Sequence, residues 1–454
     1  MPRTSFGFPL FACVTLSLLG AAGCGEKPSV EGDAGVIDLP VGGDAGGSDA
    51  GGLTDGGTTV TEDGGVGEDG GSEPAEVTWY EHVLPIAQRS CQGCHVEGGI
   101  GPFALTSYAT AQTHAEGIAD AVAQRRMPPW KADEENCRDL KHSKSLPQSE
   151  IDTIVAWAAG GAKEGDPSKA PPPRVPPPGL EWVDVTLDPG EDYAPRAQVT
   201  DDYRCFIVSP SPTATKDVIG FEVLPGTPSQ VHHVILFAVP AAEAQAADDG
   251  EEGLGWTCYG STGTPEQNVR MIGGWAPGGE ATRMPATTGV RIQPGTAFVM
   301  QVHYNLAAGN PQPDRTRVAL QYSKQSVSRP ATIFPLASQS FQIPPQSTGY
   351  TSKGTFALPS FVPNATLWGI TPHMHGLGTK IRVRNVSSGA CLVDVPKWDF
   401  HWQASYEFEQ SMPVAGGQTF EIECTWDNPT DRTVTWGEGT ADEMCIAFVY
   451  ATIP

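Results

Sequence analysis

Five histidines and one methionine are placed where they could bind metal. His373 and His375 stand two residues apart in a stretch that runs into glycines. Because side chains alternate between the two faces of a strand, a strand here would put both imidazoles on one face. The other candidates are His232, His233, His303 and Met444. Imidazole binds copper in either oxidation state and thioether sulfur favours Cu(I), so this set suits copper better than zinc. Any one of these histidines taken alone is equally typical of a hydrogen-bonded core residue.

The residues around these ligands form four short motifs in a fixed order. The motifs are Val231-His-His-Val234, Gln301-Val-His-Tyr304, His373-Met-His375 and Asp442-Glu-Met-Cys445. This ordered set resembles the type II copper, ascorbate-dependent monooxygenases, the family of the peptidylglycine α-hydroxylating and dopamine β-monooxygenases. The resemblance extends from about Trp182 to the C-terminus. It implies two consecutive antiparallel β-sandwiches of jelly-roll type, over residues 182–340 and 341–454.

The resemblance also implies two copper ions with different tasks. His232, His233 and His303 would hold a copper that stores and passes an electron. His373, His375 and Met444 would hold the catalytic copper, whose open position takes O2. The implied reaction is hydroxylation of a C–H bond in a small organic substrate.

Three positions differ from the peptide-hydroxylating members of that family. Thr371 stands where they carry an arginine, and Ile446 and Phe448 stand where they carry asparagine and tyrosine. Without a cation to bind a carboxylate, the expected substrate is a small neutral or aromatic molecule instead of a peptide C-terminus. His401, in an aromatic cluster, either lines the substrate pocket or has a structural role.

A second cofactor motif lies nearer the N-terminus. Cys91-Gln-Gly-Cys-His95 has the pattern of covalent c-type haem attachment, in which two thiols bond the haem and the histidine binds its iron. Met127, followed by two prolines, is placed to be the distal ligand, or else is a buried core methionine. For Cys91 and Cys94 the alternatives are a thioredoxin-like dithiol or half a zinc site. With helices expected over about 79–90, 105–126 and 146–160, residues 78–166 resemble a small all-α class I cytochrome c.

The elements that must position these residues follow from composition and periodicity. The proline-rich segment 167–181 predicts a semi-rigid spacer after the helical domain. Beyond it, strand-like stretches alternate with glycine, proline and asparagine clusters, so the chain is expected to be mainly β with a small α domain. Adjacent His232 and His233 would point to opposite faces of a regular strand. Joint ligation by both therefore requires a bulge or a strand end.

The N-terminus reads as an export signal. Residues 1–24 combine Arg3, an apolar run and small residues before Cys24, a pattern typical of a bacterial lipoprotein signal with lipid on Cys24. Ordinary cleavage just before a free cysteine is the alternative. Residues 25–77 are glycine-rich and acidic, a composition that predicts disorder. The segment would serve either as a tether or as a solvated tail. The expected location is the bacterial cell envelope, on the outer membrane.

Cysteine usage fits an exported protein. The family pattern implies the disulfides Cys205–Cys258 and Cys424–Cys445. Cys137 and Cys391 receive no partner from that pattern. A bridge between them would lock the haem and copper domains together, and it is not expected. The formal net charge of −25 argues against nucleic acid as a partner.

The fused haem motif suggests a source of electrons. A tethered haem, reduced by an external donor, could replace ascorbate in a bacterial envelope. The rival hypothesis is an envelope protein that uses haem and copper for electron transfer or copper handling without hydroxylating anything. A scaffold with vestigial metal sites is the third. Met444 favours the enzyme, because electron transfer alone would not need that site.

Overall fold

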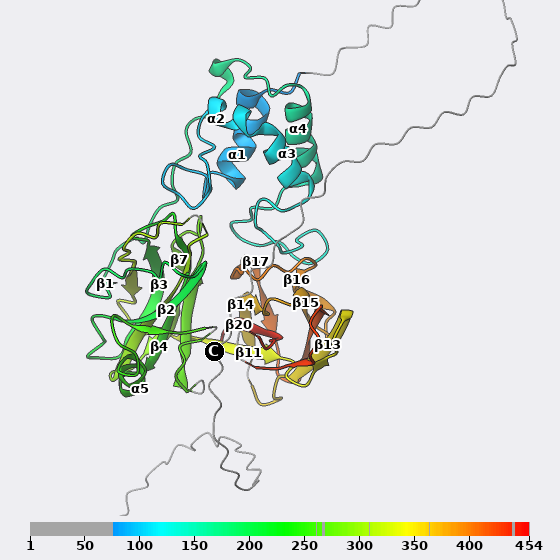
Figure 1. The fold of residues 1–454 in the computed structure, drawn as a ribbon. Coiled ribbons are helices and arrows are strands. Elements are labelled where there is room, and N and C mark those ends of the chain that lie inside the picture. Colours follow the sequence, from blue (N-terminus) through cyan, green and yellow to red (C-terminus); the bar gives the residue numbers. More distant parts are fainter. Residues whose placement is uncertain are drawn as a thin grey trace, which may run out of the picture. The chain divides into compact units, whose positions relative to one another are not determined.

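The computed structural model describes residues 76–453, except residues 260, 266, 267, 308, 363 and 438–440. The predicted signal, the lipidated Cys24 and nearly all of the tether lie outside these residues and stay predictions. Within the described part the chain is mainly β, with helices concentrated before residue 170 (Figure 1). No described helix is both long and apolar enough to cross a membrane.

The helical segment packs around two tryptophans. Trp79 and Trp157 are buried, with ring centroids 5.7 Å apart. The helices are η1 (Trp79–Val83), α1 (Leu84–Ser90), α2 (Tyr108–Thr113), α3 (Ala115–Ala123), α4 (Gln148–Ala159) and η2 (Pro167–Lys169). The single helix predicted over 105–126 is wrong, because the backbone of His114 (φ −107°, ψ 11°) leaves the helical region and separates α2 from α3.

The first sandwich packs a five-stranded sheet against the first part of a nine-stranded sheet. The five-stranded sheet has the order β5-β2-β9-β4-β6, and its partner begins β1-β10-β3-β8, with β7 paired to β3. The elements are β1 (Val185–Leu187), β2 (Asp201–Val208), β3 (Lys216–Leu224), β4 (Val231–Pro240), α5 (Ala241–Asp248), β5 (Trp256–Thr257), β6 (Arg270–Trp275), β7 (Thr282–Arg283), β8 (Thr288–Ile292), β9 (Thr296–Asn305) and β10 (Arg317–Tyr322). On β9 the even-numbered residues Phe298 to Tyr304 enter the core between the sheets, which leaves His303 on the outer face.

The second sandwich uses the remainder of the nine-stranded sheet. Its sheets have the orders β11-β20-β14-β17 and β13-β18-β15-β16, and a short pair, β12-β19, stands apart. The elements are β11 (Arg329–Ala337), β12 (Gln342–Ile343), β13 (Ser347–Ala357), β14 (Ala365–His373), β15 (Gly378–Asn385), β16 (Ala390–Val395), β17 (Tyr406–Val414), β18 (Thr419–Asn428), β19 (Val434–Thr435) and β20 (Ile446–Thr452). Burial alternates strictly along β18, as expected for a strand with one face in a core.

The two sandwiches are continuous through one strand pair. β8 and β11 run parallel, with Arg329 opposite Thr288 and Pro330 opposite Gly289. From Ala331 onward β11 pairs with β20 of the second sandwich. Strand β11 ends before the expected boundary at residue 340. The second sandwich therefore includes residues that the sequence analysis placed in the first.

Three disulfides are present among the described residues. Cys205–Cys258 and Cys424–Cys445 confirm the pairs implied by the family pattern. The third joins Cys137 to Cys391, which corrects the expectation that these two would not bridge. The reason is the path of the chain after α3. There Asp133 N donates to the carbonyl of Asp394 (2.8 Å), and Leu140 forms a β-bridge with Phe408, so this loop lies on the second sandwich.

Candidate metal centres and the cavity between them

The first cluster joins His232 and His233, at the start of β4, with His303 on β9. The ladder between these strands pairs Val231 with Tyr304 and then His233 with His303, so His232 is the extra residue of a bulge. The bulge is the irregularity that adjacent ligands require. It brings one nitrogen of each imidazole to within 4.8 Å of the others.

The contacts of these imidazoles show which ring nitrogens are already bonded within the protein and which are available to a metal. Nε2 of His303 lies 2.8 Å from a carboxylate oxygen of Asp201, and Tyr203 stacks on the same imidazole with ring centroids 4.0 Å apart. Nδ1 of His303 instead faces Nδ1 of His233 at 3.4 Å. Nδ1 of His232 is buried and finds no hydrogen-bond partner among the described residues. Converging nitrogens, one of them orphaned, with a carboxylate behind, are the arrangement of a metal site.

Burial keeps these imidazoles neutral. Desolvation is the main cause that lowers the pKa of His232 to about 3 and that of His233 well below its usual value. It also lowers the pKa of His303, although Asp201 opposes the shift. Because metal binding requires the neutral form, the cluster can take up a metal ion at neutral pH without releasing protons.

The second set lies where β14 ends and β20 begins. The rings of His373 and His375 have centroids 5.2 Å apart, and Met444 is buried just before β20. Nδ1 of His373 contacts Oε1 of Gln403 (2.6 Å), and Nδ1 of His375 contacts the carbonyl of Asp442 (3.0 Å). Nε2 of His373 is buried with no partner in the described structure. Burial lowers the pKa of His373 to about 4, so this imidazole is also neutral.

Glu443 holds the second set together and was not predicted from the sequence. Its fully buried carboxylate accepts hydrogen bonds from the backbone N–H groups of His375 (3.0 Å), Leu377 (2.7 Å) and Met444 (3.2 Å), and from the indole of Trp426 (2.9 Å). Burial raises the pKa of Glu443 and these bonds oppose the rise. In the sequence, an acidic residue directly before a candidate ligand methionine and next to a buried strand could have indicated this role.

The segment 399–403 contacts both sets of histidines. Phe400 lies with its ring centroid 6.1 Å from that of His375, and Trp402 lies 5.0 Å from His232. His401 between them is exposed, contacts Asp399 and does not line the cavity. Gln403 and Trp402 are the members of the segment that line the cavity.

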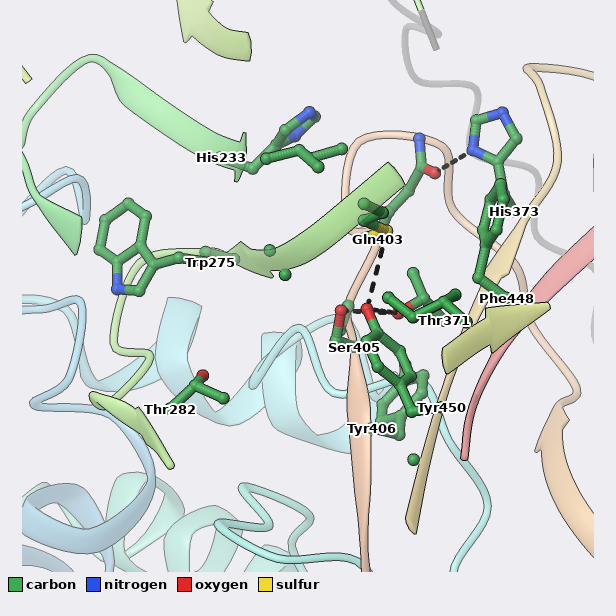
Figure 2. A pocket seen from close by; sticks show the side chains of 18 of the residues that line it. His233, Trp275, Thr282, Thr371, His373, Gln403, Ser405, Tyr406, Phe448 and Tyr450 are labelled. Atoms are coloured by element: carbon green, nitrogen blue, oxygen red, sulfur yellow. Dashed lines mark hydrogen bonds between the residues drawn. The ribbon is translucent and has the colours of Figure 1, made fainter. Parts of the chain in front are cut away.

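A cavity of about 650 Å³ lies between the two sandwiches. His233 from the first cluster borders it, as do His373 and Met444 from the second. Figure 2 shows His233 and His373 from different strands, with Trp275, Thr371, Ser405 and Tyr450 around the space. The volume is within the usual range of small-molecule sites.

Two family models match the chain across both sandwiches. The N-terminal domain of the copper type II ascorbate-dependent monooxygenases matches residues 192–311, and the C-terminal domain matches residues 331–451. Together they span more than half of the chain. The chain belongs to this family. It is therefore a copper-dependent monooxygenase, an oxidoreductase for which O2 is the co-substrate.

Similar solved structures add little to this assignment. A peptide-N(4)-(N-acetyl-β-D-glucosaminyl) asparagine amidase is 12% identical over 59% of this chain and 95% of its own, with a TM-score of 0.26. The glycosylasparaginase of Flavobacterium meningosepticum is 10% identical, with the same coverage and TM-score. The major capsid protein P2 of bacteriophage PM2 is 12% identical over 59% of this chain and 97% of its own, with a TM-score of 0.22. Likeness at this level carries no argument about function.

The haem-type motif of this copper monooxygenase lies on the loop that follows α1. Cys91 and Cys94 are free thiols, and Nδ1 of His95 contacts the carbonyl of Phe103 (2.9 Å). Such a bond commits Nδ1 and leaves Nε2 without this contact. Cys94 Sγ lies 3.3 Å from the carbonyl of Pro277, on the loop after β6. Met127 is half-buried, and none of the described contacts joins it to His95.

Proposed function

We propose that this copper monooxygenase hydroxylates a C–H bond of a small neutral substrate in the cavity between its sandwiches. His373, His375 and Met444 would hold one copper, at which O2 binding would be supplied. His232, His233 and His303 would hold a second copper, which would supply storage of an electron. The observation that supports this most strongly is that one cavity borders residues of both ligand sets. Bound copper supplies one-electron chemistry and O2 binding.

The overall reaction balances with an outside source of electrons. One oxygen atom of O2 enters the C–H bond, the other leaves as water, and two electrons and two protons are consumed. The protein's own residues orient the ligands. Asp201 contacts the imidazole of His303, and Gln403 contacts that of His373. Glu443 accepts hydrogen bonds from the backbone N–H groups of His375 and Met444 and so holds both ligands in position.

The role of Met444 is tested by copper content and by product formation together. The wild-type protein should bind two copper atoms per chain. Met444→Ala should abolish O2-dependent product while the copper at the three-histidine cluster stays bound. Met412→Ala removes a partly buried methionine elsewhere in the second sandwich and should retain activity. Normal turnover by Met444→Ala would show that hydroxylation does not take place at this site. Two bound coppers with no oxygenated product would instead favour the electron-transfer hypothesis.

For the electrons, we propose a covalently bound haem c on Cys91, Cys94 and His95, with Met127 as the distal ligand. The free thiols and the Nδ1 contact of His95 suit that group. Held by these residues, the haem would supply one-electron transfer from an external donor, and the copper site of His232, His233 and His303 would be the acceptor. Support comes from the contact of Cys94 with Pro277, because β6 ends only two residues earlier and pairs Trp275 with Val234, next to His233.

A further inference from the structure

Three hydroxyl groups meet on the cavity wall beside the second copper set. Oγ1 of Thr371 lies 2.7 Å from Oγ of Ser405 and 3.1 Å from Oη of Tyr450. We call these three residues the hydroxyl cluster. In Figure 2 they lie together, next to the Gln403–His373 pair, and all three line the cavity.

The position of the cluster relative to the copper set follows from strand geometry. Thr371 and His373 are two apart on β14, so their side chains leave the same face, and their Cα atoms are about 7 Å apart. On β20, Phe448 stands opposite Thr371 and Tyr450 stands opposite Gly369. The cluster and His373 therefore lie on the same face of this strand pair, within reach of one small molecule.

The hydrogen bonds of the cluster are incomplete. Each hydroxyl carries one donor and two acceptor sites. The hydroxyl of Tyr450 donates to Sδ of Met271 at 3.7 Å, and a thioether is a weak acceptor. Ser405 is exposed at the cavity, so its hydroxyl is accessible to a ligand. An oxygen atom of a ligand could accept the hydrogen bond of the Tyr450 hydroxyl in place of the thioether, which is a weaker acceptor. The same oxygen could also form a hydrogen bond with the hydroxyl of Ser405.

The hydroxyl cluster itself carries no charge. The lysines and the arginine of the described cavity wall make their contacts away from it: Lys141 with Glu407, Lys144 with the carbonyl of Pro277 and Arg270 with the carbonyl of Arg291. A carboxylate or an ammonium group bound at the cluster would have to exchange its hydration for neutral hydroxyls, which costs free energy.

We propose that the hydroxyl cluster anchors the substrate, and that the substrate is a neutral molecule with a hydroxyl or carbonyl oxygen on an apolar body. The oxygen binds at Thr371, Ser405 and Tyr450. The apolar body packs against Met271 and Phe448 and presents a carbon several bonds away toward His373. This inference rests on the proposed function, because it takes the cavity as the place of reaction.

Four matched probes test the anchor by calorimetry on the full-length, copper-loaded protein without oxygen. They are 3-phenylpropan-1-ol, 3-phenylpropanoate, 3-phenylpropylamine and propylbenzene, which share one body and differ in the terminal group. The alcohol should bind about 10-fold more tightly than propylbenzene, the advantage of roughly one net hydrogen bond, and more tightly than either ion. Thr371→Val and Tyr450→Phe should each remove that advantage and leave the binding of propylbenzene unchanged.

Thr282→Val is the control, because Thr282 lines the same cavity outside the cluster. It should keep the preference for the alcohol. If Thr371→Val or Tyr450→Phe does not fold, the exposed Ser405→Ala carries the test, with a weaker preference expected. Equal affinities for all four probes, no binding of any probe, or a preference that survives in the cluster variants would overturn the proposal. Because binding is measured without turnover, this failure is distinguishable from loss of copper or of product, which concerns the proposed function.

Discussion

Three of the five candidate ligand histidines are oriented by a contact on one ring nitrogen, which leaves the other nitrogen for a metal. Asp201 holds His303, Gln403 holds His373 and the carbonyl of Asp442 holds His375. These partners fix the tautomer and the direction of each ring before any metal arrives. The sequence motifs predicted the ligands but could not predict Gln403, which stands 30 residues from His373 and reaches it only through the fold.

Glu443→Gln tests how far one buried group can control the second copper set. The substitution keeps the shape of the side chain but turns one acceptor oxygen into an amide that donates, opposite N–H groups that also donate. We expect copper affinity at His373, His375 and Met444 to fall roughly 10- to 100-fold. The free energy of unfolding should also fall by about 1–3 kcal/mol.

Copper titration and thermal unfolding provide the two readouts for this variant. Glu409→Gln makes the same change at an exposed position on β17 and should leave both values unchanged. The copper of the three-histidine cluster should stay bound in either protein. Wild-type copper affinity at the second set in Glu443→Gln would show that Glu443 does not position these ligands.

At the scale of elements, the sequence predicted the sandwiches better than their connections. Alternating burial along strands such as β18 and the need for a bulge at His232 follow from local periodicity, and both are present. The break of the long helix at His114 has no clear breaker residue in the sequence. The pairing of β8 with β11 joins the sandwiches through contacts that no local pattern specifies.

The Cys137–Cys391 bridge belongs to the same class of non-local contact. Its cysteines are 254 residues apart, so their pairing depends on the loop after α3 lying on the second sandwich. Lys131 on this loop reaches Asp399 at 3.7 Å, which connects the loop to the segment beside both copper sets. The bridge therefore fixes a loop that supports the site, in addition to restricting the unfolded chain.

Replacing both cysteines of this bridge by serine should lower the free energy of unfolding by about 2–4 kcal/mol. The double substitution avoids an unpaired thiol, and thermal unfolding measures the effect. Proteolysis of the native protein should also become faster within residues 131–143, because the loop loses its covalent attachment. Copper content should be unchanged, since neither cysteine contacts a ligand. An unchanged melting temperature with an unchanged rate of cleavage would mean that the remaining contacts hold the loop without the bridge.

At the scale of the whole described chain, the haem-type motif and the first copper cluster are connected by a short series of contacts. Cys94 meets Pro277, and a Cβ placed on Gly93 would lie only 3.2 Å from Cα of Gly278, so the two loops approach closely. From there, Trp275 leads into the strand pair that carries His233. The sequence predicted both cofactor motifs, but this proximity depends on tertiary packing that spacing cannot show.

The proposed transfer of electrons from haem to copper depends on all of these parts, and haem reoxidation tests it directly. The protein is reduced without oxygen, freed of excess reductant and mixed rapidly with O2 while the haem absorbance is followed. Reoxidation should be fast in the copper-loaded protein, slow in the copper-free protein and slow in His303→Ala, because the last two lack the acceptor next to the haem-bearing segment. Equal rates in all three would contradict the account, since the haem would then pass its electron to oxygen without the copper cluster.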